Sequence, residues 1–90
     1  MISRLHPDFR RNFSKLPRNL QRRARRAYKR FKADPSHPSL QFKPLHTKLP
    51  LWSVRVTDSC RAVGVRRDDT IIWFFVGTHA EYDRLLATLP

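Results

Sequence analysis

The chain has 90 residues, of which 19 are Lys or Arg and 7 are Asp or Glu, so its net charge is +12. A chain of this length forms a small core, which favours a shallow site over a deep cleft between two lobes. Hydrophobic residues make up 40% of the chain, which argues against the disorder that so high a charge alone would suggest. We therefore expect a single domain over residues 1–90 that binds an acidic partner or a polyanion.

Cysteine usage and hydropathy exclude several classes of protein. The single cysteine, Cys60, cannot form an internal disulfide and fits a reducing compartment. No CxxC motif or Cys/His cluster has the spacing of a metal site, so we expect no metal and no other cofactor. The longest apolar run, residues 71–76, is too short to cross a bilayer, and the N-terminus lacks the apolar stretch of a signal peptide. These features predict a cytoplasmic protein with no membrane partner.

The first third of the chain has the pattern of a short strand followed by a helical hairpin. Residues 2–5 suit a strand, and Pro7 suits the first turn of a helix. A second helix begins after Pro17 and ends at Asp34-Pro35. Apolar residues at helical spacing mark the inner faces of the two helices: Phe9, Phe13, Leu16, Leu20, Ala24, Ala27, Tyr28 and Phe31.

The outer face of the second helix is strongly basic. Residues 1–33 contain 12 of the 19 basic residues, and no acid lies between Asp8 and Asp34. No ion pair at i,i+4 therefore relieves the repulsion along this helix. A solvated surface is the ordinary explanation of such a run, but the lack of acids favours an external polyanion, such as a nucleic acid or an acidic protein. The residues that we predict to bind RNA here are Arg22, Arg25, Arg26 and Lys29.

From residue 40 onwards the hydrophobic period changes to two, which is typical of strands. The stretch Leu40–Leu45 predicts one strand, and residues 52–56, 60–65 and 70–76 predict three more. Tight turns between the last three imply an antiparallel meander. The final strand is continuously apolar, which predicts a central strand covered on both faces.

The most informative stretch joins this last strand to a C-terminal helix over residues 79–88. Thr78 and Glu81 have the spacing of a capping box, which places His79 in the first helical turn. There the positive end of the helix dipole favours a neutral, proton-accepting imidazole and attracts phosphate. On spacing alone, a histidine that merely begins a surface helix is the more ordinary explanation. The whole pattern predicts a two-layer α+β fold: an N-terminal strand, a helical hairpin, an antiparallel strand meander and a C-terminal helix.

This order of elements resembles the RelE/ParE superfamily of toxins from type II toxin–antitoxin systems. The similarity rests on the basic hairpin with its bend at Pro17, on two adjacent strands that each bear an arginine (Trp52–Val56 and Cys60–Gly64), and on the step Gly77–Asp83. It spans nearly the whole chain and implies a RelE-like fold. Many RelE-like members carry an arginine at the end of the last strand, where this chain has only apolar residues. The resemblance implies that His79 substitutes for it.

RelE-like proteins cleave mRNA, usually in the ribosomal A site and without a metal, whereas ParE-like proteins poison DNA gyrase. The resemblance therefore implies a metal-independent endoribonuclease that blocks translation, with a gyrase inhibitor or a non-catalytic nucleic-acid-binding module as alternatives. The implied partners are mRNA, ribosomal RNA and a cognate antitoxin, which would hold the monomeric toxin in a hetero-oligomeric complex. The antitoxin is expected to cover the basic, sheet-side cleft or to displace the C-terminal helix. The implied catalytic residues are Arg55, Arg61, His79 and Tyr82.

The residues themselves leave some of these roles open. Arg55 and Arg61 lie on neighbouring strands with no acid nearby in sequence, so they could grip one phosphate, although arginines on a half-exposed sheet are common. Tyr82 could stack on a base or protonate a leaving group, but its place in an apolar stripe explains it equally well as a core residue. The remaining residues that we predict to bind RNA, at the rim of the same face, are Lys43, His46 and Lys48.

Overall fold

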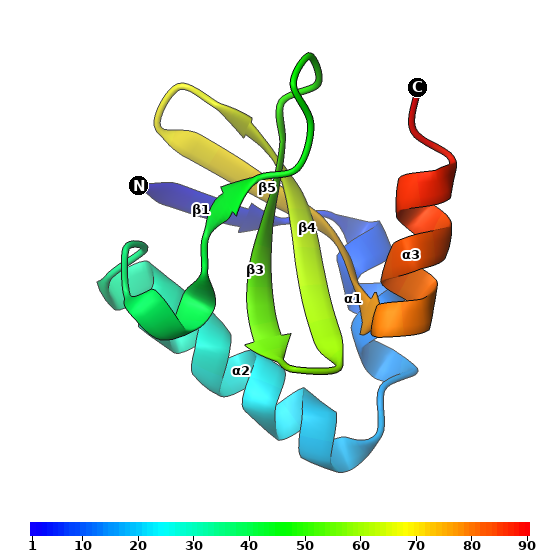
Figure 1. Ribbon diagram of the computed structural model, residues 1–90. Coiled ribbons are helices and arrows are strands. Elements are labelled where there is room, and N and C mark those ends of the chain that lie inside the picture. The colour runs from blue at the N-terminus through cyan, green and yellow to red at the C-terminus, as the bar shows by residue number, and fades with distance from the viewer.

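The computed structural model describes residues 1–90 as a five-stranded sheet with three α-helices and one 3₁₀ turn (Figure 1). The elements are β1 (Ile2–Leu5), α1 (Pro7–Ser14), α2 (Arg18–Ala33), the 3₁₀ turn η1 (Pro38–Leu40), β2 (Lys43–Pro44), β3 (Leu51–Thr57), β4 (Cys60–Arg67), β5 (Thr70–Thr78) and α3 (His79–Ala87). The predicted α+β fold is confirmed. No helix has the length and apolar character that crossing a membrane requires.

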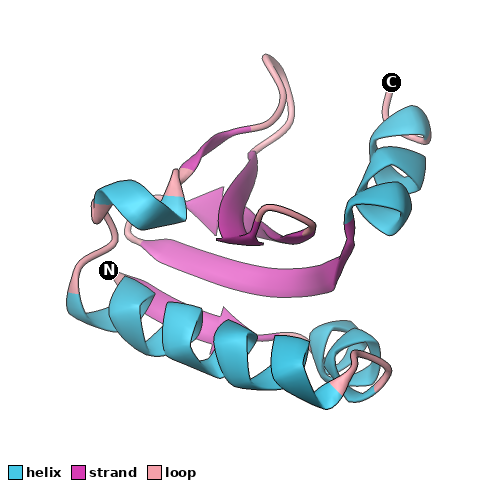
Figure 2. Cartoon of the chain, turned by 60° about the horizontal axis from the view of Figure 1, so that its bottom comes forward, coloured by secondary structure: helices cyan, strands magenta, loops and turns pink.

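The sheet has the strand order β1-β5-β4-β3-β2, and its last three long strands form the predicted antiparallel meander. β1 pairs in parallel with β5, which makes the sheet mixed. The two helices α1 and α2 lie under one face of the sheet, whereas α3 rises from the end of β5 on the other side (Figure 2). One face is therefore covered by the helical hairpin, and the other is covered only in part. We call these the hairpin face and the open face.

The core lies between the hairpin and the sheet. Phe31 of α2 packs edge-on against Trp73 of β5, with ring centroids 5.2 Å apart. The indole N–H of Trp73 donates to the Ser3 hydroxyl at 3.0 Å, which in turn donates to the Tyr28 hydroxyl at 3.1 Å. This chain of hydrogen bonds joins β5, β1 and α2, so the polar atoms within the core have partners.

The prediction of a strand over Leu40–Leu45 is wrong for most of its length. Leu40 instead ends η1, where the His37 ring accepts a hydrogen bond from the Ser39 N–H at 3.2 Å. Gln41 then adopts a left-handed conformation with φ of 46°, which interrupts any extended run. Only Lys43–Pro44 pairs with β3.

The expectation that the apolar strand is covered on both faces is also wrong in part. Ile71, Trp73 and Val76 are buried, but Ile72 is 40% exposed. The reason is that α3 covers the open face only near the end of β5 (Figure 2). A continuous apolar run cannot show where on the sheet the covering helix lies.

Candidate active site

Two arginines face each other across the central strands. Arg55 of β3 is the direct cross-strand neighbour of Arg61 of β4, and Arg61 is the neighbour of Gly77 of β5. The adjacent row is Val54, Ala62 and Val76, which is buried in the core. Since successive side chains alternate between the faces of a sheet, both arginines lie on the open face.

Arg55 has an acidic partner, so the expectation that no acid lies near it in sequence is wrong. The Arg55 Nε–H donates to the Asp58 carboxylate at 3.1 Å, and one terminal N–H donates to the same oxygen. This hydrogen bond and the charge of Arg55 lower the pKa of Asp58, and the charges of Arg61 and Arg23 lower it further. Asp58 thus lies within the field of three arginines. Asp58 follows Arg55 by three residues at the β3–β4 turn, and this spacing could have indicated the ion pair from the sequence.

The hydrogen-bond acceptors of Arg61 within the chain are neutral carbonyl oxygens. Its guanidinium donates to the Thr57 carbonyl oxygen and, at 3.2 Å, to the Cys60 carbonyl oxygen. These bonds fix the side chain and use part of its five donors. The remaining donors are available to a phosphate.

The capping box predicted at the start of α3 is present. The Thr78 N–H donates to the Glu81 carboxylate at 2.9 Å, and the Glu81 N–H approaches the Thr78 hydroxyl at 3.4 Å. The backbone hydrogen bond from Thr78 lowers the pKa of Glu81. In addition, the His79 N–H donates to the Ser59 carbonyl oxygen at 2.7 Å. This bond ties the first turn of α3 to the β3–β4 turn, next to Arg61.

The His79 side chain is half exposed and lies 3.0 Å, through Nδ1, from the Asp83 carboxylate. With a proton on Nδ1 donated to Asp83, the other ring nitrogen, Nε2, is free to accept one. The sequence prediction missed Asp83, although its i,i+4 spacing from His79 on a helix is a readable signal. The imidazole is therefore held on the open face in a defined orientation.

Tyr82 contacts the His79 ring edge-on, with ring centroids 5.9 Å apart. The tyrosine is only 9% exposed, so it packs in the protein, as one of the two explanations from the sequence expected. The Tyr82 hydroxyl forms no hydrogen bond within the chain. Since every buried side-chain nitrogen and oxygen has a partner, this hydroxyl is accessible to solvent. The ring is therefore a packed residue with an accessible hydroxyl, and its role in chemistry stays a prediction.

The three residues predicted at the rim differ in their surroundings. Lys43 is paired with Ser53, two residues from Arg55, and is exposed on the same face. Lys48 is exposed in the loop before β3. The ring nitrogens of His46 both have partners within the chain: Nε2 lies 2.8 Å from the Pro90 carbonyl oxygen, and Nδ1 accepts the N–H of Lys48 and of the following residue at 3.0 Å. Both ring nitrogens therefore hold the loop and the C-terminus, and RNA binding by His46 stays a prediction.

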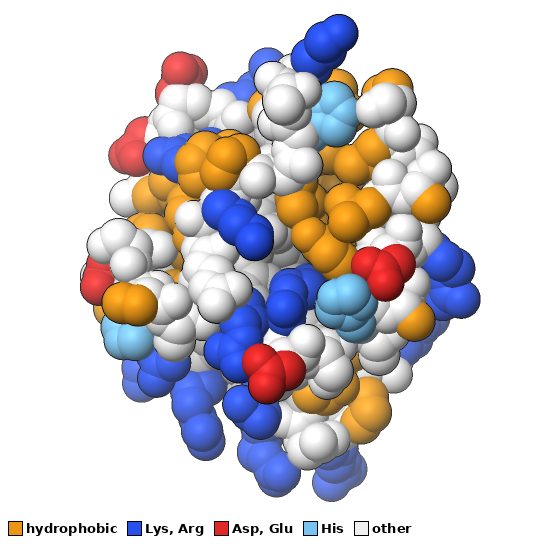
Figure 3. Space-filling model, in the orientation of Figure 1, with side chains coloured by type: hydrophobic (Ala, Val, Ile, Leu, Met, Phe, Trp, Pro, Cys, Tyr) orange, Lys and Arg blue, Asp and Glu red, His pale blue; other side chains and the backbone are white.

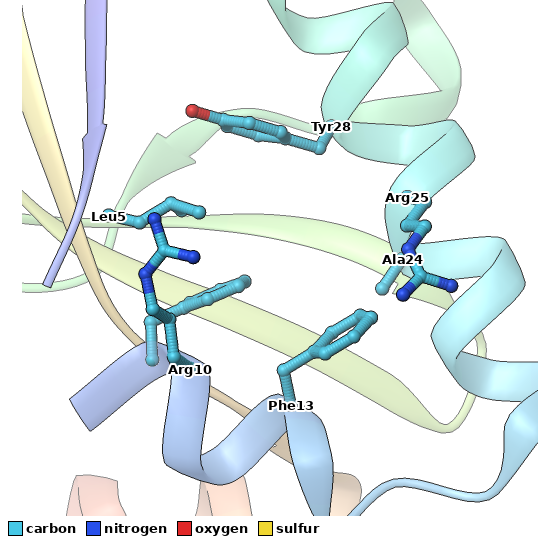
Figure 4. A pocket seen from close by; sticks show the side chains of 7 residues that line it. Leu5, Arg10, Phe13, Ala24, Arg25 and Tyr28 are labelled. Atoms are coloured by element: carbon cyan, nitrogen blue, oxygen red, sulfur yellow. The ribbon is translucent and has the colours of Figure 1, made fainter. Parts of the chain in front are cut away.

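The basic residues of α2 do not form one surface. Arg25 turns towards α1, where its guanidinium lies 5.0 Å from the centre of the Phe13 ring. Figure 4 shows it at one side of a hollow of about 290 Å³ between the two helices, with Arg10 at the other side and Leu5 and Tyr28 beyond. This hollow is largely apolar and lies away from the paired arginines of the open face.

Arg26 instead lines a groove of about 260 Å³ between α2, η1 and β3, which we call the arginine groove. Its residues are Arg23, Arg26, Ala27, Arg30, Ser39, Leu40, Arg55 and Val56. Figure 3 shows Lys and Arg side chains continuing from the lower ends of β3 and β4 towards α2. Arg23 and Arg30 were not among the predicted RNA-binding residues, because helix periodicity alone does not show which basic residues meet the edge of the sheet.

Cys60 takes no part in the exposed site. It is fully buried, and burial raises the pKa of its thiol to about 11. No group of three or more His, Cys, Asp or Glu side chains is arranged to hold a metal ion.

Comparison with known proteins places this architecture among the toxins of toxin–antitoxin systems. A family model, the ParE-like toxin domain, matches residues 18–84, and the chain belongs to that family. The resemblance to the RelE/ParE superfamily is thereby confirmed. A search of curated proteins gave no match.

Solved structures with the same fold include toxins captured with their antitoxins. The RelB–RelE antitoxin–toxin complex from Methanococcus jannaschii superposes with a TM-score of 0.72 at 17% identity, covering 90% of this chain and 96% of that one. The RelBE2 toxin–antitoxin complex from Mycobacterium tuberculosis gives 0.68 at 23% identity, covering 86% and 95%. YafQ from Escherichia coli gives 0.64 at 13% identity, covering 89% and 94%. At these identities the similarity is one of fold.

Proposed function

We propose that this toxin is a metal-independent endoribonuclease that cuts mRNA, on the ribosome, and so blocks translation in the cytoplasm. The observation that carries the proposal is the imidazole of His79, which is oriented by Asp83 and tied by its backbone to the turn beside Arg61. Arg61 and Arg55 add two cross-strand cations to the same face. Transfer of a phosphoryl group to the 2′-oxygen of RNA requires a proton acceptor and cations that stabilise the phosphoryl charge, and these residues are of both kinds.

The proposed reaction proceeds in one displacement. Nε2 of His79 takes the proton of the 2′-hydroxyl, and the 2′-oxygen attacks the adjacent phosphorus. The bond from phosphorus to the 5′-oxygen breaks, and the leaving oxygen receives a proton from the Tyr82 hydroxyl. Arg55 and Arg61 stabilise the negative charge that builds up on the phosphoryl oxygens. Asp83 positions the imidazole and stabilises the charge that it gains.

The antitoxin is proposed to act by covering this patch. The M. jannaschii and M. tuberculosis structures are toxin–antitoxin complexes, which supports an antitoxin as the partner of this chain as well. An acidic antitoxin segment over Arg55 and Arg61 would block RNA, and displacement of α3 would remove His79 from the site.

The test is to induce the toxin in cells and map mRNA ends by primer extension. The wild-type protein is expected to give discrete cuts, and Arg61→Ala or His79→Ala is expected to remove them. Arg67→Ala is the matched control for Arg61, because Arg67 lies on the same strand and face but at the far end, paired with Thr70. Cuts that persist in His79→Ala would refute the proposed chemistry.

Membership of the ParE-like family supports one alternative, inhibition of DNA gyrase. A gyrase inhibitor needs no proton acceptor, so His79→Ala would remain toxic. Plasmid supercoiling from the same induced cells decides between the two, because loss of supercoiling with intact mRNA would establish gyrase as the target.

A further inference from the structure

We infer that the arginine groove binds the phosphates of the RNA strand next to the bond that is cut, so that one continuous track of arginines holds the substrate. This inference rests on the proposed function and adds to it a binding surface outside the catalytic patch. Its central residues are Arg23, Arg26 and Arg30 on α2, together with Arg55 at the end of the groove.

The groove is lined by four arginines and by no acidic residue. Neither Arg23 nor Arg26 forms an ion pair within the chain, since the ion pairs involve other residues. Arg55 is already paired with Asp58, so one of the four charges is compensated within the chain. The guanidinium groups of Arg23, Arg26 and Arg30 have no acidic partner, and they repel one another unless a further anion lies between them.

The geometry of the groove is partly fixed in advance. Arg30 donates to the Ser39 hydroxyl at 3.0 Å, and that hydroxyl lies 2.9 Å from the His37 ring. The buried Leu40 side chain contributes to the lining, as do Ala27 and Val56. A groove with arginines along its walls and apolar side chains among them suits a chain of phosphates with attached sugars and bases.

The groove is continuous with the candidate active site. Arg55 lines the groove and is also the cross-strand neighbour of Arg61. Arg23 of the groove and both of these arginines act on the same carboxylate, Asp58, whose pKa they lower. β2 pairs only with residues 52 and 53 of β3, so no neighbouring strand blocks the passage beside Arg55. A phosphate bound between Arg55 and Arg61 would therefore have its neighbours along the strand in the groove.

This continuity favours RNA over an acidic segment of the antitoxin as the occupant. A nucleic acid strand must leave the catalytic patch in some direction, and its charges recur at every nucleotide. An antitoxin needs no such path, and it could bind equally well on the apolar hollow between α1 and α2. The groove is also lined by arginine alone among basic residues, and arginine binds phosphate through two parallel hydrogen bonds.

The test compares two double variants that remove the same charge. Arg23→Gln/Arg26→Gln alters the groove, whereas Lys15→Gln/Arg18→Gln removes two exposed charges at the bend of the hairpin, outside the groove. The probe is a fluorescein-labelled, 12-nucleotide single-stranded RNA with 2′-O-methyl groups throughout, which cannot be cut. Binding is followed by fluorescence anisotropy from 50 to 300 mM KCl, after thermal melts show that both variants are folded.

We expect the groove variant to bind the RNA at least tenfold more weakly at low salt. Its slope of log K against log[salt] is expected to be smaller by about 1.4, which corresponds to about 0.7 for each of two lost phosphate contacts. The bend variant is expected to stay within threefold of wild type with an unchanged slope. Equal losses in the two variants would overturn the inference, because charge alone would then explain binding.

A second measurement separates this inference from the proposed function. If the wild-type protein cuts no RNA while the groove variant still shows the smaller slope of log K against log[salt], the nuclease proposal fails and the groove remains assigned to RNA binding. If the wild type cuts RNA and the groove variant binds RNA like the bend variant, only the groove assignment fails. Loss of antitoxin binding in the groove variant, with RNA binding unchanged, would assign the groove to the antitoxin instead and refute our inference.

Discussion

Along each strand, side chains of the hairpin face alternate with side chains of the open face. On the hairpin face, Val54 and Val76 lie in the core, with 6% and 2% exposure. On the open face, the next residues are Arg55 and Gly77, and Arg55 is 29% exposed. The same strands therefore provide the stability of the fold and the rigid support of the candidate site. We therefore expect changes in the row of Val54 and Val76 to affect mainly stability, and changes at Arg55 and Arg61 to affect mainly function.

The largest effect on stability is expected from Phe31→Ala on the hairpin face. Phe31 is 2% exposed and packs edge-on against Trp73 and Phe42, at 5.2 and 5.0 Å between ring centroids. Truncation of a buried phenylalanine costs about 3–5 kcal/mol through lost burial and the cavity that remains. Urea unfolding measures this cost, with Phe31→Leu as the milder control. A loss below about 1 kcal/mol would show that the core is not packed as described.

The two glycines provide a matched comparison of the faces. A Cβ on Gly64 would lie 2.9 Å from the Ile72 carbonyl oxygen and 2.9 Å from the Trp73 ring, in the backbone and core of β5. A Cβ on Gly77 would instead meet the Phe75 ring at 2.9 Å and the Glu81 side chain, which can move. We expect Gly64→Ala to cost about 1–3 kcal/mol and Gly77→Ala to cost less. Urea unfolding of both variants checks this, and the reverse order would contradict the assignment of the faces.

Thr78→Ala is expected to cost about 1 kcal/mol, because it removes the side-chain acceptor at the start of α3. Thr78→Ser, which keeps the hydroxyl, is the control and should retain most of the stability. Thermal unfolding measures the difference. If alanine and serine destabilise the protein equally, the cap does not stabilise α3.

Glu81 in the same capping box predicts a dependence of stability on pH. Its pKa is lowered in the folded protein, chiefly by the hydrogen bond from the Thr78 N–H, so the folded state favours the carboxylate. This contribution is present above the ordinary value of 4.5 and is lost as pH falls through the lowered pKa. Glu81→Gln should therefore flatten the decline of unfolding free energy below pH 4.5. A decline equally steep in wild type and Glu81→Gln would contradict the assigned hydrogen bond.

The smallest effect on stability is expected from Arg55→Gln on the open face. Its ion pair with Asp58 is exposed to solvent, and such pairs contribute about 0–1 kcal/mol. We expect the free energy of unfolding to change by less than about 0.5 kcal/mol, whereas mRNA cleavage falls at least tenfold. Unfolding and primer extension on the same variant test this separation. A large loss of stability would show that the site and the core are not independent.

Most of the fold could be predicted from the sequence because local signals agreed with the final packing. The hydrophobic period of two identified the strands β3 and β4, the continuous apolar run identified β5, and the spacing of Thr78 and Glu81 identified the start of α3. The strand expected at Leu40 failed because His37 and Pro38 form a tight local turn that periodicity does not detect. The parallel pairing of β1 with β5 depends on contacts between the two ends of the chain, and no local pattern encodes these.

The candidate site could be predicted less completely than the fold. The pairing of Arg55 with Arg61 follows from the turn between their strands, and the sequence therefore indicated it. The partners Asp58 and Asp83 were not predicted, because a spacing of three or four residues permits an ion pair but does not show that one forms. The division of the α2 arginines between two surfaces depends on how that helix lies against β3 and α1, which only the three-dimensional structure shows.

The reaction that we propose for the open face is transfer of a phosphoryl group to the 2′-oxygen of RNA. The most direct measurement is mass spectrometry of the RNA ends that the purified toxin produces on translating ribosomes. We predict a 2′,3′-cyclic phosphate on one fragment and a 5′-hydroxyl on the other, and no cut where a single 2′-deoxynucleotide replaces the one before the bond. A 3′-hydroxyl paired with a 5′-phosphate, or cutting next to the deoxynucleotide, would exclude transfer to the 2′-oxygen.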